Sequence, residues 1–246
     1  MPLILRKVKA FLRFFAEIIR LILRILLCHS VLRSMTINAA TILGFLKSLA
    51  DERRVFCSEM DFQIHFAWLM KEHGFDLSLE HDPGCFEANA SLDIMIWKPE
   101  RVAIELKYKT SRFEVETTGH SVHLKNHGAQ DHGRYDFFKD VSRIEQIVAT
   151  GKADKGFAVF LTNDGGYWRN GRDGTADAMF RMFEGRTVKS GSLKWAEHTG
   201  AGTMKGHEKP ISLVRDYVLG WKDYMDFGKK NGLFRFLIVD VEKRSI

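Results

Sequence analysis

Two short apolar runs carry acidic and basic side chains that could do chemistry together. Residues 91–97 hold Asp93, and residues 101–109 hold Glu105 and Lys107. Three residues that include a proline separate the runs, which predicts a β-hairpin or a closely connected pair of strands. Alternate side chains of a strand share a face, so Glu105 and Lys107 should project together, roughly 6.6 Å apart along the backbone. Asp93 on the neighbouring strand could then meet Glu105.

Two carboxylates and an ammonium group at one end of a sheet suit a divalent cation. Mg²⁺ keeps several waters and binds through one or two carboxylates plus phosphate oxygens of a substrate. The metal polarises the phosphorus centre and lowers the pKa of a bound water. Lys107 could orient that water or offset the charge that develops on the phosphate. These residue types therefore fit phosphodiester hydrolysis, and the alternative is a surface ion pair between Glu105 and Lys107 at a strand end.

The residues Leu92-Asp93, followed by Glu105-x-Lys107, resemble the motif of the PD-(D/E)XK nuclease superfamily. Leu92 stands where the family usually has proline, a position that takes no part in the chemistry. The resemblance covers residues 56–162. It implies an α/β fold with a mixed central sheet flanked by helices, a restriction-endonuclease-like core in the order α-β-β-β-α-β.

The resemblance also implies a metal-dependent endonuclease that acts on DNA rather than RNA. Asp93, Glu105 and the Leu106 carbonyl would hold Mg²⁺ or Mn²⁺, and Lys107 would assist the attacking water. A homodimer is a further implication, because many relatives cut two strands as dimers. Two rival interpretations remain, namely a catalytically silent nucleic-acid-binding module on the same fold and a membrane-associated interaction protein.

An acidic residue on the first core helix often adds to the metal site in this superfamily. Glu59 is the candidate for that role, with Asp61 and Glu52 as competitors, and the alternative is a solvated helix carboxylate. The expected substrate-binding residues are Lys109, Arg143 and Gln146. The last two lie on the expected helix 134–149, which flanks the metal site in the resembled fold. Their alternative is an ordinary solvent-facing stripe.

Periodicity and breaker residues predict the remaining elements. Helices are expected at 36–50, 53–73 and 134–149. Strands are expected at 75–79, 155–162, 211–219 and 233–241, with a turn or short helix at 220–232.

The segment 109–133 reads as polar and irregular, and it carries four histidines: His120, His123, His127 and His132. Three histidines in eight residues suggest zinc. However, the segment has neither helical periodicity nor a cysteine partner, so a polar loop near the active site is the favoured explanation. A general-base histidine remains an alternative.

A glycine-rich insert spans about 163–209, and residues 177–184 within it could form a helix. Its arginines could contact phosphate, and Tyr167, Trp168 and Trp195 could stack on exposed bases. The alternative is an insert whose tryptophans pack onto the core.

The net charge of +6 lies in the first part of the chain. Residues 1–34 hold seven of the 37 basic residues and one of the 31 acidic residues, so the rest carries 30 of each. Any binding of polyanions by the body must therefore come from local patches. Three cysteines without a close pair favour reduced thiols in the cytoplasm. No P-loop or G-x-S-x-G sequence occurs.

Residues 3–27 place charged side chains every three or four positions, which predicts a basic amphipathic helix. It could lie on a membrane surface or against a partner, although no uncharged run is long enough to span a bilayer. The alternative is a non-native extension ahead of Met35. The expected organisation is thus 1–34 as an accessory helix and 35–246 as one nuclease-like domain.

Overall fold

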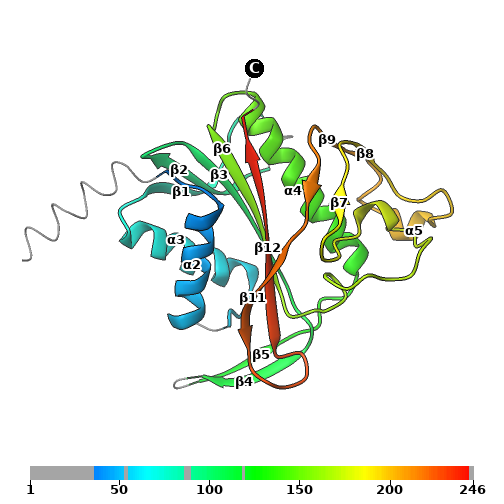
Figure 1. The fold of residues 1–246 in the computed structure, drawn as a ribbon, viewed down its shortest axis with the longest axis horizontal. Helices are drawn as coiled ribbons and strands as arrows, with labels where there is room; N and C mark the ends of the chain where they lie inside the picture. The colour runs from blue at the N-terminus through cyan, green and yellow to red at the C-terminus, as the bar shows by residue number, and fades with distance from the viewer. Residues whose placement is uncertain (1–35, 53–54, 86–89, 118–119, 244–246) are drawn as a thin grey trace, which may run out of the picture. The chain divides into compact units, whose positions relative to one another are not determined.

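Figure 1 shows the computed structural model, which describes residues 36–52, 55–85, 90–117 and 120–243. The chain divides into two units, Met1–Thr36 and Ile37–Ile246. The amphipathic helix expected at residues 3–27 lies outside the described residues. Within the described ranges, no helix has the length and apolar character needed to cross a membrane.

The second unit is a mixed α/β structure, as predicted, built on a six-stranded sheet with the order β1-β2-β3-β6-β12-β11. Strands β3 and β6 pair in parallel, and every other neighbouring pair is antiparallel. Both central strands are buried along nearly their whole length. The strands are β1 (Asp76–His81), β2 (Leu92–Lys98), β3 (Val102–Lys109), β6 (Lys155–Thr162), β11 (Trp221–Asp226) and β12 (Leu233–Glu242).

Helices cover both faces of this sheet (Figure 1). Helices α2 (Ala39–Glu52) and α3 (Glu59–Glu72) lie on one face, and α4 (Gln130–Ala149) lies on the other. Ser58 caps α3, because its hydroxyl accepts a hydrogen bond of 3.1 Å from the Asp61 N–H. This cap places Glu59 in the first turn of the helix, close to the end of β3.

Hairpin β4 (Phe113–Thr117) and β5 (His120–Leu124) follows β3 directly. The prediction of an irregular segment at 109–133 is therefore wrong. The sequence signal was the alternation of buried Phe113, Val122 and Leu124 with exposed neighbours, which favours strands with one covered face. Helix α4 also begins four residues earlier than the predicted 134.

Three further expectations need correction. The helix expected at 177–184 is only the 3₁₀ turn Ala178–Phe180. The segment 220–232, expected to be a turn or short helix, contains strand β11. The strand expected at 211–219 is broken into β9 (Ile211–Leu213) and β10 (Tyr217–Val218), which pair outside the main sheet.

The glycine-rich insert packs onto α4. Its short elements are β7 (Thr187–Val188), β8 (Gly191–Leu193) and α5 (Ala201–Met204). Tyr167 and Trp195 are buried in the core cluster on the α4 side of the sheet, and Trp168 is partly buried against it. The expectation that these rings stack on exposed bases is therefore wrong for Tyr167 and Trp195. Burial of their large apolar surface explains why the insert is ordered.

The close approach of α4 to the sheet depends on Gly156 in β6. A Cβ atom there would lie 2.3 Å from Ile144 Cγ2 and 2.8 Å from the Ala103 carbonyl oxygen. We expect Gly156→Ala to lower the free energy of unfolding by about 1–3 kcal/mol, because overpacking forces helix and sheet apart. Gly44→Ala is the matched control, since no atom lies within 4 Å of its added Cβ in α2. That change should raise stability by about 0.5–1 kcal/mol. Urea unfolding measures both, and equal stability of Gly156→Ala and the parent would contradict this account of the packing.

Candidate active site

Strands β2 and β3 separate soon after they pair. Their ladder joins Ile94–Ile96 to Val102–Ile104, and β3 then continues to Lys109 without β2. The backbone N–H groups on that edge need other acceptors, since unpaired buried donors are costly. Asp93 Oδ2 accepts from the Leu106 N–H at 2.6 Å, and Glu59 Oε2 accepts from the Tyr108 N–H at 2.7 Å. The strand divergence therefore brings two carboxylates to the edge of β3.

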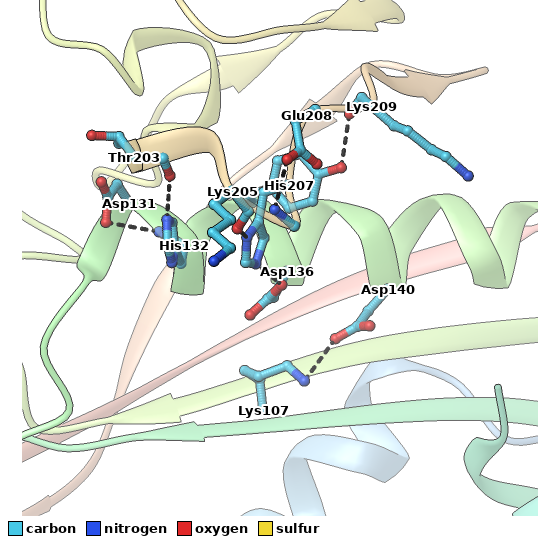
Figure 2. Close-up of polar contacts among 12 residues, drawn as sticks. Lys107, Asp131, His132, Asp136, Asp140, Thr203, Lys205, His207, Glu208 and Lys209 are labelled. Carbon is cyan, nitrogen blue, oxygen red and sulfur yellow. Dashed lines mark hydrogen bonds and ion pairs between the residues drawn. The ribbon is translucent and has the colours of Figure 1, made fainter. Parts of the chain in front are cut away.

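Lys107 projects from β3 toward α4 and lies between two acids. Its Nζ is 3.1 Å from Asp140 Oδ2 on α4 and 3.5 Å from Glu59 Oε1 on α3. Figure 2 shows the lysine below the helix, with its amine directed at Asp140. One side chain thus connects helices that lie on opposite faces of the sheet.

Glu105, two residues earlier on the same face of β3, is deeply buried, with a side chain only 4% exposed. Its Oε1 lies 3.2 Å from Arg143 Nη1 on α4, and Arg143 also lies 3.6 Å from Asp140 Oδ1. The Arg143 guanidinium donates to the Ser91 carbonyl as well. Within the described residues, however, Glu105 Oε1 receives no hydrogen bond of acceptable geometry. Arg143 therefore offsets this carboxylate without fully satisfying it.

Burial shifts the proton affinities of these acids upward. It raises the pKa of Asp93 to about 6, with the Asp140 and Glu59 carboxylates acting in the same direction and the Leu106 N–H and Lys107 opposing. Burial, followed by the charges of Asp140 and Asp93, also raises the pKa of Glu105 well above its ordinary value. Burial likewise raises the pKa of Asp140.

Lys107 is shifted upward for a different reason. Burial alone would disfavour its charged form, but the carboxylates of Asp140 and Glu59 outweigh that effect and raise its pKa. Lys107 therefore remains an ammonium ion at neutral pH. It can donate hydrogen bonds and stabilise negative charge, but it cannot act as a general base.

The cluster has an excess of negative charge that a cation could offset. It combines four carboxylates (Glu59, Asp93, Glu105 and Asp140) with two cations (Lys107 and Arg143). The Leu106 N–H faces Asp93, and within a strand the carbonyl of the same residue points to the same side. Two carboxylates and one carbonyl are oxygen ligands of the kind that Mg²⁺ takes. No group of three or more His, Cys, Asp or Glu side chains in the described ranges is arranged to hold a metal ion.

A second layer of hydrogen bonds holds the backbone at Asp93. Gln63 Nε2 on α3 donates to the Asp93 carbonyl at 2.9 Å and to Glu80 Oε1 at 2.7 Å. The Ser91 hydroxyl donates to Glu80 Oε2 at 2.5 Å. These contacts connect β1, β2 and α3, so they fix the point at which β2 leaves β3.

The structure brings together most of the predicted site residues. Asp93, Glu105, Lys107 and Glu59 converge, while the rival Asp61 instead accepts from the Cys57 N–H near the start of α3. The three residues expected to bind substrate are placed differently. Lys109 follows Lys107 on the same side of β3. Arg143 is engaged with Glu105, Asp140 and a backbone carbonyl, and Gln146 donates to the Cys85 carbonyl at 2.8 Å.

Asp140 is the residue that sequence reasoning missed. An aspartate in the expected helix 134–149 would ordinarily belong to its polar side, yet the Asp140 side chain is only 8% exposed. The available signal was its spacing, because Asp140 lies three residues after Phe137 and four before Ile144, both buried. An acid inside an apolar stripe needs a buried partner, and that partner is Lys107.

Of the four histidines, the side chain of His120 lies outside the described residues, and the other three do not form a common site. His123 lies on the exposed side of β5, and His132 stacks on His207 with ring centroids 4.2 Å apart (Figure 2). His127 Nδ1 accepts from the Thr110 N–H at 2.9 Å. Burial, aided by the nearby Lys109, lowers the pKa of His127. Of these three, only His127 lies close enough to feel the charge of Glu59.

The buried charge of Asp93 should reduce the stability of the metal-free protein. The pKa of Asp93 is about 6 in the folded state and 3.8 in the unfolded state. The Asp93 carboxyl therefore contributes favourably to the free energy of unfolding below pH 4, and this contribution is lost as pH rises through 6. Asp93→Asn keeps an acceptor for the Leu106 N–H but carries no charge. Relative to the parent, the free energy of unfolding of Asp93→Asn should rise by on the order of 1–3 kcal/mol between pH 4.5 and 7.5, because one pKa unit corresponds to 1.36 kcal/mol.

Urea unfolding in EDTA at these two pH values tests this prediction. Asp173→Asn, at an exposed position, is the control and should show no pH-dependent gain. If the free energies of unfolding of Asp93→Asn and the parent change in parallel with pH, the buried charge of Asp93 does not destabilise the fold.

We compared the chain with known protein families, curated proteins and solved structures. No family model, curated protein or solved structure matches the chain. The function of the chain is therefore inferred from the arrangement of these residues and from the resemblance of their motif.

Proposed function

We propose that this protein is a Mg²⁺-dependent nuclease that hydrolyses phosphodiester bonds in DNA. The observation that carries the proposal is the convergence of Asp93, Glu105 and Lys107 at the point where β2 and β3 separate. Glu59 joins them from α3 through the Tyr108 N–H and Lys107. This set matches the motif by which the sequence resembles the PD-(D/E)XK superfamily.

The order of elements supports the same proposal. From α3 to β6 the chain runs through one helix, three strands, a second helix and a fourth strand, with hairpin β4–β5 inserted before α4. A restriction-endonuclease-like core has the order α-β-β-β-α-β. The motif residues lie on the second and third of these strands, which is where the resemblance expects them.

The residues present fit a hard divalent cation. Asp93, Glu105 and the Leu106 carbonyl would hold Mg²⁺ or Mn²⁺, and among the described parts of the chain Glu105 Oε1 has no hydrogen-bond donor. When bound, the ion would lower the pKa of a coordinated water and offset charge on the phosphate. Because Asp93 and Glu105 have raised pKa values, metal binding would release protons and weaken as pH falls.

Lys107 supplies a fixed positive charge beside the reacting phosphate. As the water oxygen bonds to phosphorus and the bond to the leaving sugar oxygen breaks, negative charge grows on the phosphate oxygens. An ammonium group held by Asp140 and Glu59 stabilises that charge without rearranging. Asp140 is a positioning residue in this scheme, because it acts through Lys107.

Substrate would approach from the side of Glu59, whose side chain is 42% exposed. Close to that side, His127 borders a cavity of 430 Å³ beyond the end of β3, which Ser111, Gln130 and Arg134 also line. Glu105 lies deepest in the cluster. A phosphate entering by this route would meet Lys107 before it met Glu105.

One observation favours a second candidate, a catalytically silent nucleic-acid-binding module. Arg143 lies 3.2 Å from Glu105 Oε1, and burial favours the protonated form of Glu105. A carboxylic acid that keeps its proton and its arginine neighbour is a poor metal ligand. Cytoplasmic location, dimerisation and a membrane role for residues 3–27 remain hypotheses that rest on the sequence alone.

Removing the charge of the motif residues tests the nuclease proposal. We expect Asp93→Ala and Lys107→Met to reduce Mg²⁺-dependent cleavage of duplex DNA by at least about 100-fold, since each removes a metal ligand or a charge-stabilising donor. Binding of the same DNA should survive. Lys98→Ala, at an exposed position at the far end of β2, is the control and should cleave normally. A parent protein that binds DNA but never cleaves it with Mg²⁺ or Mn²⁺ would leave the silent module as the answer.

Asp140→Asn tests whether that residue positions Lys107. Without the Asp140 carboxylate, the pKa of Lys107 should fall and its ammonium group should lose its nearest acidic partner, so it should stabilise the developing charge less well. We expect kcat to fall by about 10–100-fold with a smaller change in KM. Asp136→Asn, one turn earlier on α4 and beside His207, is the control. In the Lys107→Met background, Asp140→Asn should have little further effect on kcat; a loss that persists in full in that background would assign Asp140 a merely structural role.

A further inference from the structure

A second pocket lies where hairpin β4–β5 meets the turn between β11 and β12. It has a volume of 460 Å³, and its lining is Arg112, Phe113, Glu114, Lys229, Lys230 and Asn231. Figure 1 shows the hairpin and this turn side by side at one end of the sheet. Three basic side chains face a single acidic one, so the lining carries a net charge of about +2.

This local charge stands out against the rest of the body. Residues 35–246 carry 30 basic and 30 acidic side chains, so the body as a whole does not attract a polyanion. The candidate active site is itself negative without a metal, and it would repel the phosphates of DNA. Affinity for DNA must therefore come from a positive region elsewhere.

The pocket is held in shape by contacts between its two walls. Lys229 Nζ donates to the Glu114 carbonyl at 2.7 Å and lies 5.0 Å from the Phe113 ring centroid. Asn231 Nδ2 donates to the Arg112 carbonyl at 3.0 Å. Asn163, at the end of β6, donates to the Asn231 carbonyl at 2.9 Å. The basic groups thus stand on a preorganised frame, which lowers the entropic cost of binding a ligand.

The pocket also lies on the continuation of the active-site strand. From Lys107 the chain passes through Lys109 and reaches Arg112 after five residues, a span of at most roughly 17 Å. Phosphate groups along one DNA strand advance by about 3.4 Å per nucleotide. One DNA segment could therefore contact both regions, with at most about five nucleotides between them.

We infer that this pocket, defined by Arg112, Lys229 and Lys230, is a second binding site for the phosphate backbone of the DNA substrate. The inference rests on the proposed nuclease function for the identity of the ligand. The site would position the backbone within about five nucleotides of the scissile bond and supply binding energy that the acidic active site lacks. It would not read sequence, because phosphate contacts carry no base information.

The test uses the full chain and removes two exposed charges without touching the Lys229 contact. The double substitution Arg112→Gln with Lys230→Gln is compared with Lys194→Gln, an exposed lysine next to β8. Binding to a 30-base-pair duplex is measured by fluorescence anisotropy over a salt series, in the Asp93→Asn background and without metal. We expect about tenfold weaker binding at low salt. The slope of log K against log salt should also become shallower by about 1.8, close to 0.9 per lost phosphate contact.

The outcomes separate this inference from the nuclease proposal. An unchanged affinity and salt slope in the double variant would overturn the pocket assignment, even if the parent cleaves DNA. If the double variant shows the shallower slope but the parent never cleaves DNA, the pocket assignment stands and the nuclease proposal is wrong. If Lys194→Gln changes the salt slope as much as the double variant does, any surface lysine contributes to binding. That result would also overturn the pocket assignment. Urea unfolding of the double variant should match the parent, because the exposed Arg112–Glu114 pair contributes little to stability.

Discussion

Two backbone N–H groups on the free edge of β3 impose the constraint on which the candidate site depends. Strand β2 leaves β3 after three paired residues, so Leu106 and Tyr108 cannot donate to a neighbouring strand. Buried donors must still be satisfied. Carboxylates of Asp93 and Glu59 accept those bonds, and this brings negative charge to the strand that already carries Glu105. The point where β2 stops pairing with β3 is thus where the acidic side chains come together.

The acids are then balanced only in part. Lys107 and Arg143 lie among four carboxylates, and burial raises the pKa values of Asp93, Glu105 and Asp140. A core that served only stability would not collect this much unbalanced charge, because desolvation exceeds the gain from pairing. Such a cost is expected where a site must hold a cation or a phosphate. The basic pocket that we propose as a second site for the phosphate backbone lies away from this cluster, beside hairpin β4–β5.

The elements that the sequence predicted well are those with strong local patterns. The apolar run at 155–162 became the central strand β6, and the two motif runs became β2 and β3. The errors lie where local pattern is weak. Residues 109–133 hold a hairpin whose apolar positions are few, and residues 220–232 hold β11, an edge strand that is ordered by pairing with β12. For the glycine-rich insert the alternative holds for Tyr167 and Trp195, whose rings are buried in the core cluster on the α4 side.

The candidate site divides along the same line. The sequence by itself determined that Glu105 and Lys107 share a face, because the period of a strand is two residues. It also singled out Asp93 through its place in a motif, and the resemblance made Glu59 a candidate beside Asp61 and Glu52. Only the tertiary structure showed that Asp140 and Arg143 complete the cluster and that Gln146 does not. Those contacts depend on where α4 crosses β3, and the chain's periodicity does not specify which residues more than thirty positions apart will meet there.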